Sequence, residues 1–394
     1  MSTRSKTSPR PEGGRTPMAV HEQMTTLTAG SDQSLERDLL LSTEPVGFAY
    51  FDLESLGEDD RRLHWGELAH TLRDQGASVA ATATIAARVA EAVQSPATLA
   101  VFAGPDGDLL HEQLLTGARP SSLAGCTAPA RIAPLLAWKR DRPAYVLVVI
   151  DRTGADITAG SAGGANVRHW SVEGPDDEIE RNAPGGWSQP RYQRRAEDSW
   201  RHNAGRVATE VARAAAEVHA QALVVSGDVR AVQLLTERLP RNGEMLVRHI
   251  SGSRSPDGSQ LRRAADVERA LREVADEQTG LLLDELRLHL VPDGRGVEGP
   301  AETIGALAAG RVSTLFVVDE PRDERVAWFG SDATDVYADR ASAVAAGRPV
   351  QAGRLADVAI RAALLSDAYV RVLDPGTPGQ PGGGVGALCR FVAD

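Results

Sequence analysis

The sequence predicts a mixed α/β fold of the α+β kind, with three α/β domains in series behind a disordered N-terminal tail. Short apolar runs of the strand type alternate with patterns of helical period, which is typical of sheets covered by helices. A length of 394 residues exceeds what one hydrophobic core usually holds. Residues 1–32 are rich in Ser, Thr, Pro, Gly and Arg without periodicity, which indicates disorder. We therefore expect a tail at 1–32 and domains at 33–140, 141–275 and 276–394.

The first domain is predicted from short strands and two helical patterns. The sequence Gly104-Pro105-Asp106-Gly107 separates two apolar runs, and these residue types favour a tight turn between paired strands. We therefore expect a β-hairpin here. The expected elements are strands at 46–52, 99–103 and 108–110 and helices at 62–72 and 79–93.

The middle domain opens with the strongest strand pattern of the chain, Tyr145–Asp151. A long helix is predicted after residue 190, because apolar residues recur at helical spacing. These residues are Val207, Val211, Ala214, Ala215 and Val218. The other expected elements are strands at 155–158, 166–172 and 222–227, a polar loop at 173–190, and a helix at 230–239 stopped by Pro240.

The third domain follows a long helical pattern at 261–290 that bridges into it. Gly310 ends a shorter helix, since glycine readily adopts the left-handed conformation at helix C-termini. A Gly/Pro loop is expected at 375–384. The remaining elements are helices at 301–309 and 355–365 and strands at 312–318, 325–329, 369–373 and 386–392.

Composition excludes several classes of protein. With 43 basic and 54 acidic residues the net charge is -11, which argues against a protein that coats nucleic acid along its whole surface. No stretch approaches the ~20 apolar residues that span a bilayer, and the N-terminus has no apolar core of a secretory signal. Cys126 and Cys389 lie too far apart in the sequence for a disulfide framework or a zinc motif. We expect a cytoplasmic protein without metal or other cofactor.

Familiar catalytic motifs are absent from the sequence. It has no Walker loop, no Gly-x-Gly-x-x-Gly after a strand, no Gly-x-Ser-x-Gly and no His-Glu-x-x-His. Asp151, Asp156 and Asp177 form one open alternative, a carboxylate-metal nuclease site in the middle domain. Asp151 and Asp156 flank a tight turn, where aspartate is expected for structural reasons, so this alternative is disfavoured.

One segment, Asn182 to Arg195, combines a glycine-rich tip with a basic helix start. Gly185 and Gly186 permit close approach to another molecule, and Trp187, Ser188 and Gln189 follow. Between 181 and 206, six arginines stand against Glu197 and Asp198, a net charge of +4. This pattern is typical of binding to a phosphate backbone, although a plain loop before a solvated helix fits the spacing equally well. The candidate RNA-binding residues share one helical side: Arg191, Arg194, Arg195 and Arg201.

A second basic run, Arg241 to Arg272, holds seven arginines against four acidic residues, a net charge of +3. We interpret it as a solvated surface.

The string Gly-Gly-Trp-Ser-Gln-x-x-x-Gln-Arg-Arg resembles the Gly-Gly-Gln loop of archaeal and eukaryotic class-one peptide-chain release factors and their relative Pelota. In that family a middle domain of strands carries the loop just before a long helix. The segments Thr303–Leu307 and Gly310–Leu315 resemble the family's C-terminal domain. The chain is more similar still to the bacterial, mainly actinobacterial, branch that includes the Balon-type ribosome hibernation factors. This resemblance implies the three-domain release-factor and Pelota architecture over residues 46–394.

Two departures from the family pattern bear on activity. Trp187 and Ser188 separate the glycines from Gln189, so Gln189 fits a looser Gly-x-x-Gln pattern, which resembles the loop of Vms-type peptidyl-tRNA-cleaving relatives. Glutamine has no useful pKa, so catalysis by Gln189 would depend on positioning and polar stabilisation. The first domain also lacks the Asn-Ile-Lys-Ser string that reads stop codons in the family. Termination at stop codons is therefore not expected.

The resemblance implies a ribosome A-site-binding translation factor that acts in ribosome hibernation or stress protection. Its expected partners are the ribosome, through rRNA and the P-site tRNA, with elongation factor Tu as a further candidate. No membrane or DNA partner is expected. Two alternatives stay open: a peptidyl-tRNA hydrolase that rescues ribosomes with Gln189 as its candidate catalytic residue, and a ribosome-independent RNA-binding stress protein.

Overall fold

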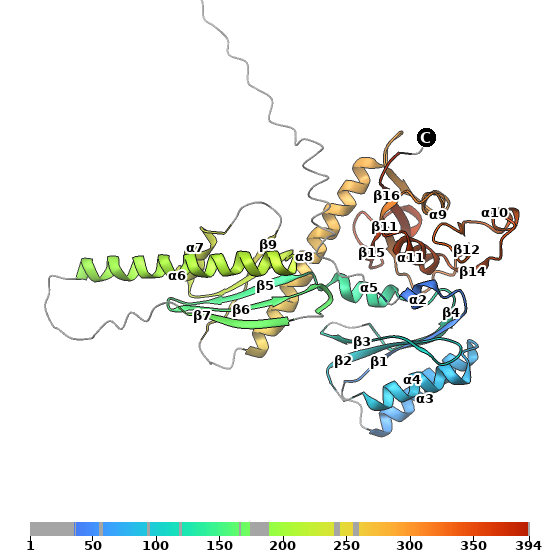
Figure 1. Ribbon diagram of the computed structural model, residues 1–394, viewed down its shortest axis with the longest axis horizontal. Helices are drawn as coiled ribbons and strands as arrows, with labels where there is room; N and C mark the ends of the chain where they lie inside the picture. Colours follow the sequence, from blue (N-terminus) through green and yellow to red (C-terminus); the bar gives the residue numbers. More distant parts are fainter. Residues whose placement is uncertain are drawn as a thin grey trace, which may run out of the picture.

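The computed structural model describes residues 35, 37–54, 58–92, 95–117, 120–164, 167–173, 189–239, 245–254 and 260–392. This part of the chain is a mixed α/β structure with several sheets and covering helices, as the sequence predicts (Figure 1). The predicted tail at 1–32 lies outside the described residues. No helix in these ranges is long and apolar enough to cross a membrane.

The first sheet is antiparallel, with strand order β3-β2-β1-β4. Alternate residues of β1 point to opposite faces, because successive side chains of a strand alternate. Phe51 packs under helices α3 and α4, whereas Phe48 and Tyr50 belong to a second core on the other face. The elements are α2 (Arg37–Leu41), β1 (Val46–Asp52), α3 (Glu58–Asp74), α4 (Val79–Glu91), β2 (Ala97–Ala103), β3 (Leu109–Thr116), β4 (Leu123–Thr127) and α5 (Ala133–Arg140).

The second sheet is mixed, with order β7-β6-β5-β8-β9. Strands β5, β8 and β9 run parallel, and β5, β6 and β7 form an antiparallel meander. Helices α6 and α7 pack on one face of this sheet, and α8 packs on the other. The elements are β5 (Tyr145–Ile150), β6 (Gly154–Gly160), η1 (Ala162–Gly164), β7 (Val167–Glu173), α6 (Gln189–Val218), β8 (Ala222–Gly227), α7 (Val229–Thr236), β9 (Leu246–His249) and α8 (Gln260–His289).

Helix α8 belongs to two cores at once. Leu271 in its first half packs against β8 of the second sheet. Leu282 and Leu286 in its second half pack against Phe316 of the third sheet. The domain limit expected at 275/276 falls inside this helix, between the part that packs on one sheet and the part that packs on the other.

The last part of the chain holds two small sheets, with orders β10-β16-β11-β15 and β13-β12-β14. Helix α11 is apolar nearly all round, and it is buried in contact with strands of both sheets. Figure 1 shows it among these strands. The elements are β10 (Gly296–Glu298), α9 (Pro300–Ala308), β11 (Val312–Val318), β12 (Val326–Phe329), β13 (Val336–Tyr337), α10 (Arg340–Ala345), β14 (Gln351–Arg354), α11 (Leu355–Leu365), β15 (Tyr369–Leu373), η2 (Gly382–Gly384) and β16 (Val385–Cys389).

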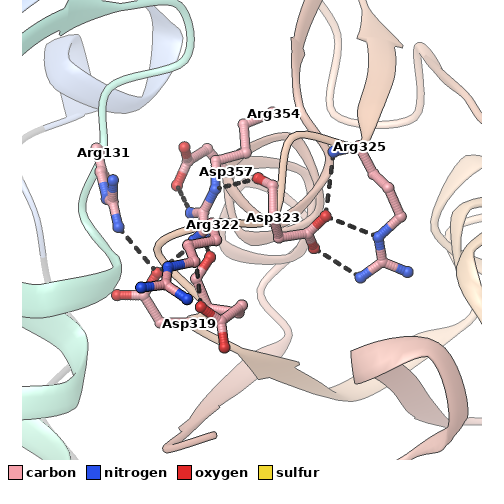
Figure 2. Close-up of polar contacts among 8 residues, drawn as sticks. Arg131, Asp319, Arg322, Asp323, Arg325, Arg354 and Asp357 are labelled. Carbon is pink, nitrogen blue, oxygen red and sulfur yellow. Dashed lines mark hydrogen bonds and ion pairs between the residues drawn. The ribbon is translucent and has the colours of Figure 1, made fainter.

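The first and last parts of the chain pack directly against each other. Phe102 and Leu135 belong to the same buried cluster as Leu315 and Ile360. A Cβ atom at Gly353 of β14 would lie 2.6 Å from the carbonyl oxygen of Ala128, so the two backbones approach closely here. Arg131 and Asp319 form an ion pair across this contact, with 3.4 Å between Nη2 and Oδ1 (Figure 2).

Candidate functional site

Helix α6 is the element that would carry the predicted binding residues. It forms because apolar residues recur every three or four positions and give it a stripe that faces the sheet. Val207, Val211 and Ala214 of this stripe are buried under the helix, as predicted. At 30 residues the helix is about 45 Å long, longer than the strands it covers.

The turn between β5 and β6 supports α6 near residue 200. The guanidinium of Arg152 lies 4.7 Å from the centre of the Trp200 ring. The buried Asn203 donates a hydrogen bond from Nδ2 to the carbonyl oxygen of Arg152, at 3.2 Å. Arg152 also pairs with Asp228, which caps α7. These contacts fix the direction of α6 where it reaches the end of the sheet.

The first eleven residues of α6 precede this support, so they extend about 16 Å further along the helix axis. Figure 1 shows this end of α6 projecting past β5, β6 and β7. Gln189 is the first residue of the helix, and positions 191, 194 and 195 lie in its first two turns. The helical period places positions 191 and 195 on the side opposite the buried stripe and positions 194 and 201 on the flank of the helix between the two. The predicted loop tip, Gly185, Gly186, Trp187 and Ser188, lies outside the described residues.

Positive charge is concentrated in the first half of α6, of which the projecting end is a part. Between 189 and 206 five arginines stand against two acidic residues, a net charge of +3. Arg201 and Arg206 have exposed side chains. In the second half of the helix Arg213 pairs with Glu210 at 2.8 Å, so its charge is locally neutralised. The N-terminal end of the helix macrodipole adds to the positive potential, which would attract an anionic partner.

The possible nuclease site does not have the arrangement that a metal needs. Arg254 lies 3.0 Å from Asp156 Oδ1 and 3.5 Å from Asp151 Oδ1, so a guanidinium already holds both carboxylates. Burial acts to raise the pKa of Asp151, but hydrogen bonds from Thr153 and Gly154 and the charge of Arg254 bring it below its ordinary value. Asp177 lies outside the described residues. Within the described ranges, no group of three or more His, Cys, Asp or Glu could hold a metal ion.

Several arginines of the second basic run are paired with carboxylates, and some of them are half-buried instead of fully solvated. Arg248 bonds Glu277 on α8, and Arg269 bonds Asp266. Arg263 donates to the carbonyl oxygen of Ser253 at 2.6 Å. These pairs offset part of the positive charge of this run.

Sequence reasoning missed the residues that hold α6 in place. Arg152, Trp200 and Asn203 come together only because the β5–β6 turn folds under the helix, and Arg152 and Asn203 are 51 residues apart. The one signal in the sequence was Trp200 itself, a half-buried residue that lies on the apolar side of α6, seven residues before Val207. A tryptophan there needs a packing or stacking partner.

The part of the chain that contains this basic helix and its sheet is similar to known proteins. Residues 144–290, which span β5 to α8, match the family model described as bacterial archaeo-eukaryotic release factor family 2. The matched range is less than half of the 394-residue chain, and within it the chain is similar to the bacterial branch of the archaeo-eukaryotic release factors.

Relatives were found among both sequences and solved structures. The uncharacterized protein Rv2629 of Mycobacterium tuberculosis (strain H37Rv) is 27% identical over 302 residues, which cover 75% of this chain and 78% of that protein. Pelota of Archaeoglobus fulgidus aligns with 92% of this chain and 93% of its own, at 14% identity and a TM-score of 0.35. The archaeal termination factor aRF1 aligns with 95% and 98% of the two chains, at 14% identity and a TM-score of 0.22.

Proposed function

We propose that this protein is a ribosome A-site-binding translation factor of release-factor type that does not read stop codons. The observation that carries the proposal is the projecting, positively charged start of α6 within the part of the chain that matches the release-factor model. A rigid helix of this length delivers the preceding loop to a distant point without ordering a long flexible linker. The same feature supports insertion into an RNA-lined site.

The chemistry of recognition would be contact between guanidinium groups and rRNA or tRNA phosphates. Arginine suits this role because its planar fork binds phosphate oxygens in a bidentate manner. Each phosphate contact releases counterions, so binding weakens steeply as salt rises. Trp187 would add stacking on a base, worth about 1–3 kcal/mol.

Co-sedimentation with 70S ribosomes tests the proposal. We expect the parent protein to pellet with ribosomes, and the R191E/R194E/R195E variant to lose at least tenfold in affinity. We also expect that variant to show a salt dependence, as the slope of log affinity against log salt, smaller by about 2–3. The matched control is R73E/R230E/R340E, which changes the net charge equally at exposed arginines on α3, α7 and α10.

The control variant should bind as the parent does. Failure of the parent protein to pellet would overturn the proposal and favour a ribosome-independent RNA-binding stress protein. Equal loss in both triple variants would show that overall charge, and not the start of α6, governs binding.

The finer role we propose is hibernation or stress protection, in which the loop occupies the site without cleaving peptidyl-tRNA. Elongation factor Tu and the P-site tRNA are the further partners to test in the same pelleting assay. The rival role is ribosome rescue by peptide release. Release from stalled ribosomes that Gln189→Ala abolishes would establish the rival, whereas binding without release supports the protective role.

A further inference from the structure

A polar cavity lies where the first part of the chain meets the last. Its volume is about 370 Å³, within the ~300–1,000 Å³ range of ligand sites. Phe48 and Leu123 of the first sheet line one side. Three charged residues also line it: Arg131 from the segment before α5, Arg354 at the end of β14, and Asp357 in the first turn of α11. Figure 2 shows Arg131 approaching Asp319 of the last part of the chain from the neighbouring segment.

All three charged side chains leave a hydrogen-bonding atom unused. Arg131 Nε, Arg354 Nη1 and Asp357 Oδ1 are buried and make no hydrogen bond to any described residue. The Asp357 side chain is 1% exposed, and its Oδ1 lies 3.5 Å from Arg354 Nη1 without hydrogen-bond geometry. A buried polar atom left without a partner typically costs about 1–3 kcal/mol. Arg354 Nη1 and Asp357 Oδ1 still attract each other as an ion pair, so Arg131 Nε is the one of the three atoms that has no such contact. An acceptor placed between the two guanidiniums would satisfy Arg131 Nε together with Arg354 Nη1.

We propose that this cavity binds a compact oxyanion, of the sulfate and phosphate class, between Arg131 and Arg354. The two guanidiniums would donate from Nε and Nη1, and the acid form of Asp357 would donate a third hydrogen bond. Because Arg131 and Arg354 come from different parts of the fold, the bound anion would tie the first and last domains together. This site goes beyond the proposed ribosomal function and does not depend on it.

The charges around the cavity support a ligand of one negative charge or more. Asp319 accepts from Arg131 at 3.4 Å and from Arg354 at 3.1 Å, so it offsets one of the two guanidiniums. Tyr50 of β1 is buried and donates its hydroxyl to the carbonyl oxygen of Arg131. With Asp357 in its acid form, the four ionisable groups other than Tyr50 carry a net charge of +1. The start of α11 adds positive potential from its backbone dipoles.

The ionisation of Asp357 links anion binding to pH. Burial raises its pKa to about 7, although the charges of Arg354 and Arg131 act to lower it and that of Asp319 acts to raise it. Loss of its proton removes one donor and cancels the net positive charge. Affinity for the anion should therefore fall as pH rises above about 7, by up to tenfold per pH unit.

Titration calorimetry of the full chain with sodium sulfate tests the site, since sulfate does not itself titrate between pH 6 and 8. At pH 6.5 and constant ionic strength we expect one saturable site in the parent protein. Arg354→Gln and Arg131→Gln should each weaken it at least tenfold. Arg325→Gln is the matched control, because Arg325 pairs with Asp323 outside this cavity. This variant should bind sulfate as tightly as the parent protein does.

Asp357→Asn keeps a donor at the same place and cannot ionise. This variant should retain sulfate binding and lose its pH dependence. A misfolded variant would lose sulfate binding altogether, so the result distinguishes a role of the Asp357 proton from a loss of folding. The R191E/R194E/R195E variant should also retain the site, since α6 does not line the cavity. Competition by adenosine 5′-monophosphate would identify a phosphate monoester as a natural source of the anion, and competition by inorganic phosphate alone would identify the free ion. No saturable sulfate binding, or equal binding by all variants, would overturn the proposal.

Discussion

Asp357 shows how burial changes the chemistry of a single residue. Its side chain is 1% exposed, yet its nearest cation, Arg354, is held at 3.5 Å and makes no hydrogen bond to Oδ1. The attraction therefore falls short of the desolvation cost, and the pKa rises to about 7. Nothing in the local sequence predicts this, because Arg131 and Asp319, whose charges act on Asp357, are 188 residues apart.

Asp357→Asn should change stability in a pH-dependent manner. In the parent protein the folded state keeps the Asp357 proton up to about pH 7, whereas the unfolded chain loses it near pH 4. The folded state is favoured at low pH, and this contribution is lost as pH rises, at up to about 1.4 kcal/mol per unit between pH 4 and 7. Relative to the parent, the variant should therefore gain stability from pH 5 to pH 8. Urea unfolding in chloride buffer without sulfate or phosphate measures this difference, and a difference that stays constant with pH would contradict the assignment.

Some features of the candidate site could be predicted from neighbouring residues in the sequence, and others depend on residues that are distant in the sequence. The arginines at the start of α6 were predictable because charge and helical spacing are local properties of the sequence. The support from Arg152, and the neutralisation of Asp151 and Asp156 by Arg254, depend on the folded sheet. Whether Gln189 is catalytic stays a prediction.

At the scale of elements, long periodic segments were predicted well and short ones were not. The strand at 145–151 and the helices at 261–290 and 355–365 are confirmed within a few residues. Strand β4 and strand β9 were missed, because five or four residues carry no readable alternation. Strand β4 is defined by its pairing with β1, which begins 77 residues earlier. Such pairing energy is not visible in local propensity.

Helix α8 offers an element-scale test, because it serves two cores. Gly280 lies on its exposed side, and an added Cβ atom there would meet nothing within 4 Å. Gly280→Ala should raise helix stability by about 0.5–1 kcal/mol, since alanine loses less backbone entropy on folding. Because the helix is continuous, amide hydrogen exchange should slow in both its halves. Gly66→Ala on the exposed face of α3 is the matched control, and it should leave amide hydrogen exchange in α8 unchanged. Slower exchange in only one half of α8 would show that the helix is broken in solution.

At the scale of the whole molecule, the sequence predicted three α/β units in series and gave no sign that the first and last pack together. That contact depends on α2, α5 and β14, which are short or individually unremarkable in sequence. Arg361 makes it specific: it is 2% exposed and donates from Nε to the carbonyl oxygen of Leu40 at 2.8 Å. Arg140 likewise donates to the carbonyl oxygen of Val372. The middle sheet has its own cluster and is joined to this pair through α8.

This arrangement predicts that the first and last domains unfold as one unit. Leu135 on α5 is fully buried in the shared cluster, and Leu235 on α7 is fully buried in the separate cluster of the middle sheet. Leu135→Ala should cost about 2–5 kcal/mol, as deletion of a buried leucine side chain usually does. Hydrogen exchange should then accelerate in β1 and also in β11 and α11. Leu235→Ala, a matched deletion, should accelerate exchange in the middle sheet and leave β11 and α11 as they were. If Leu135→Ala accelerated exchange only in β1 to α5, the shared cluster would not couple the first and last domains. The oxyanion proposed between them would then not strengthen an existing coupling of the two domains.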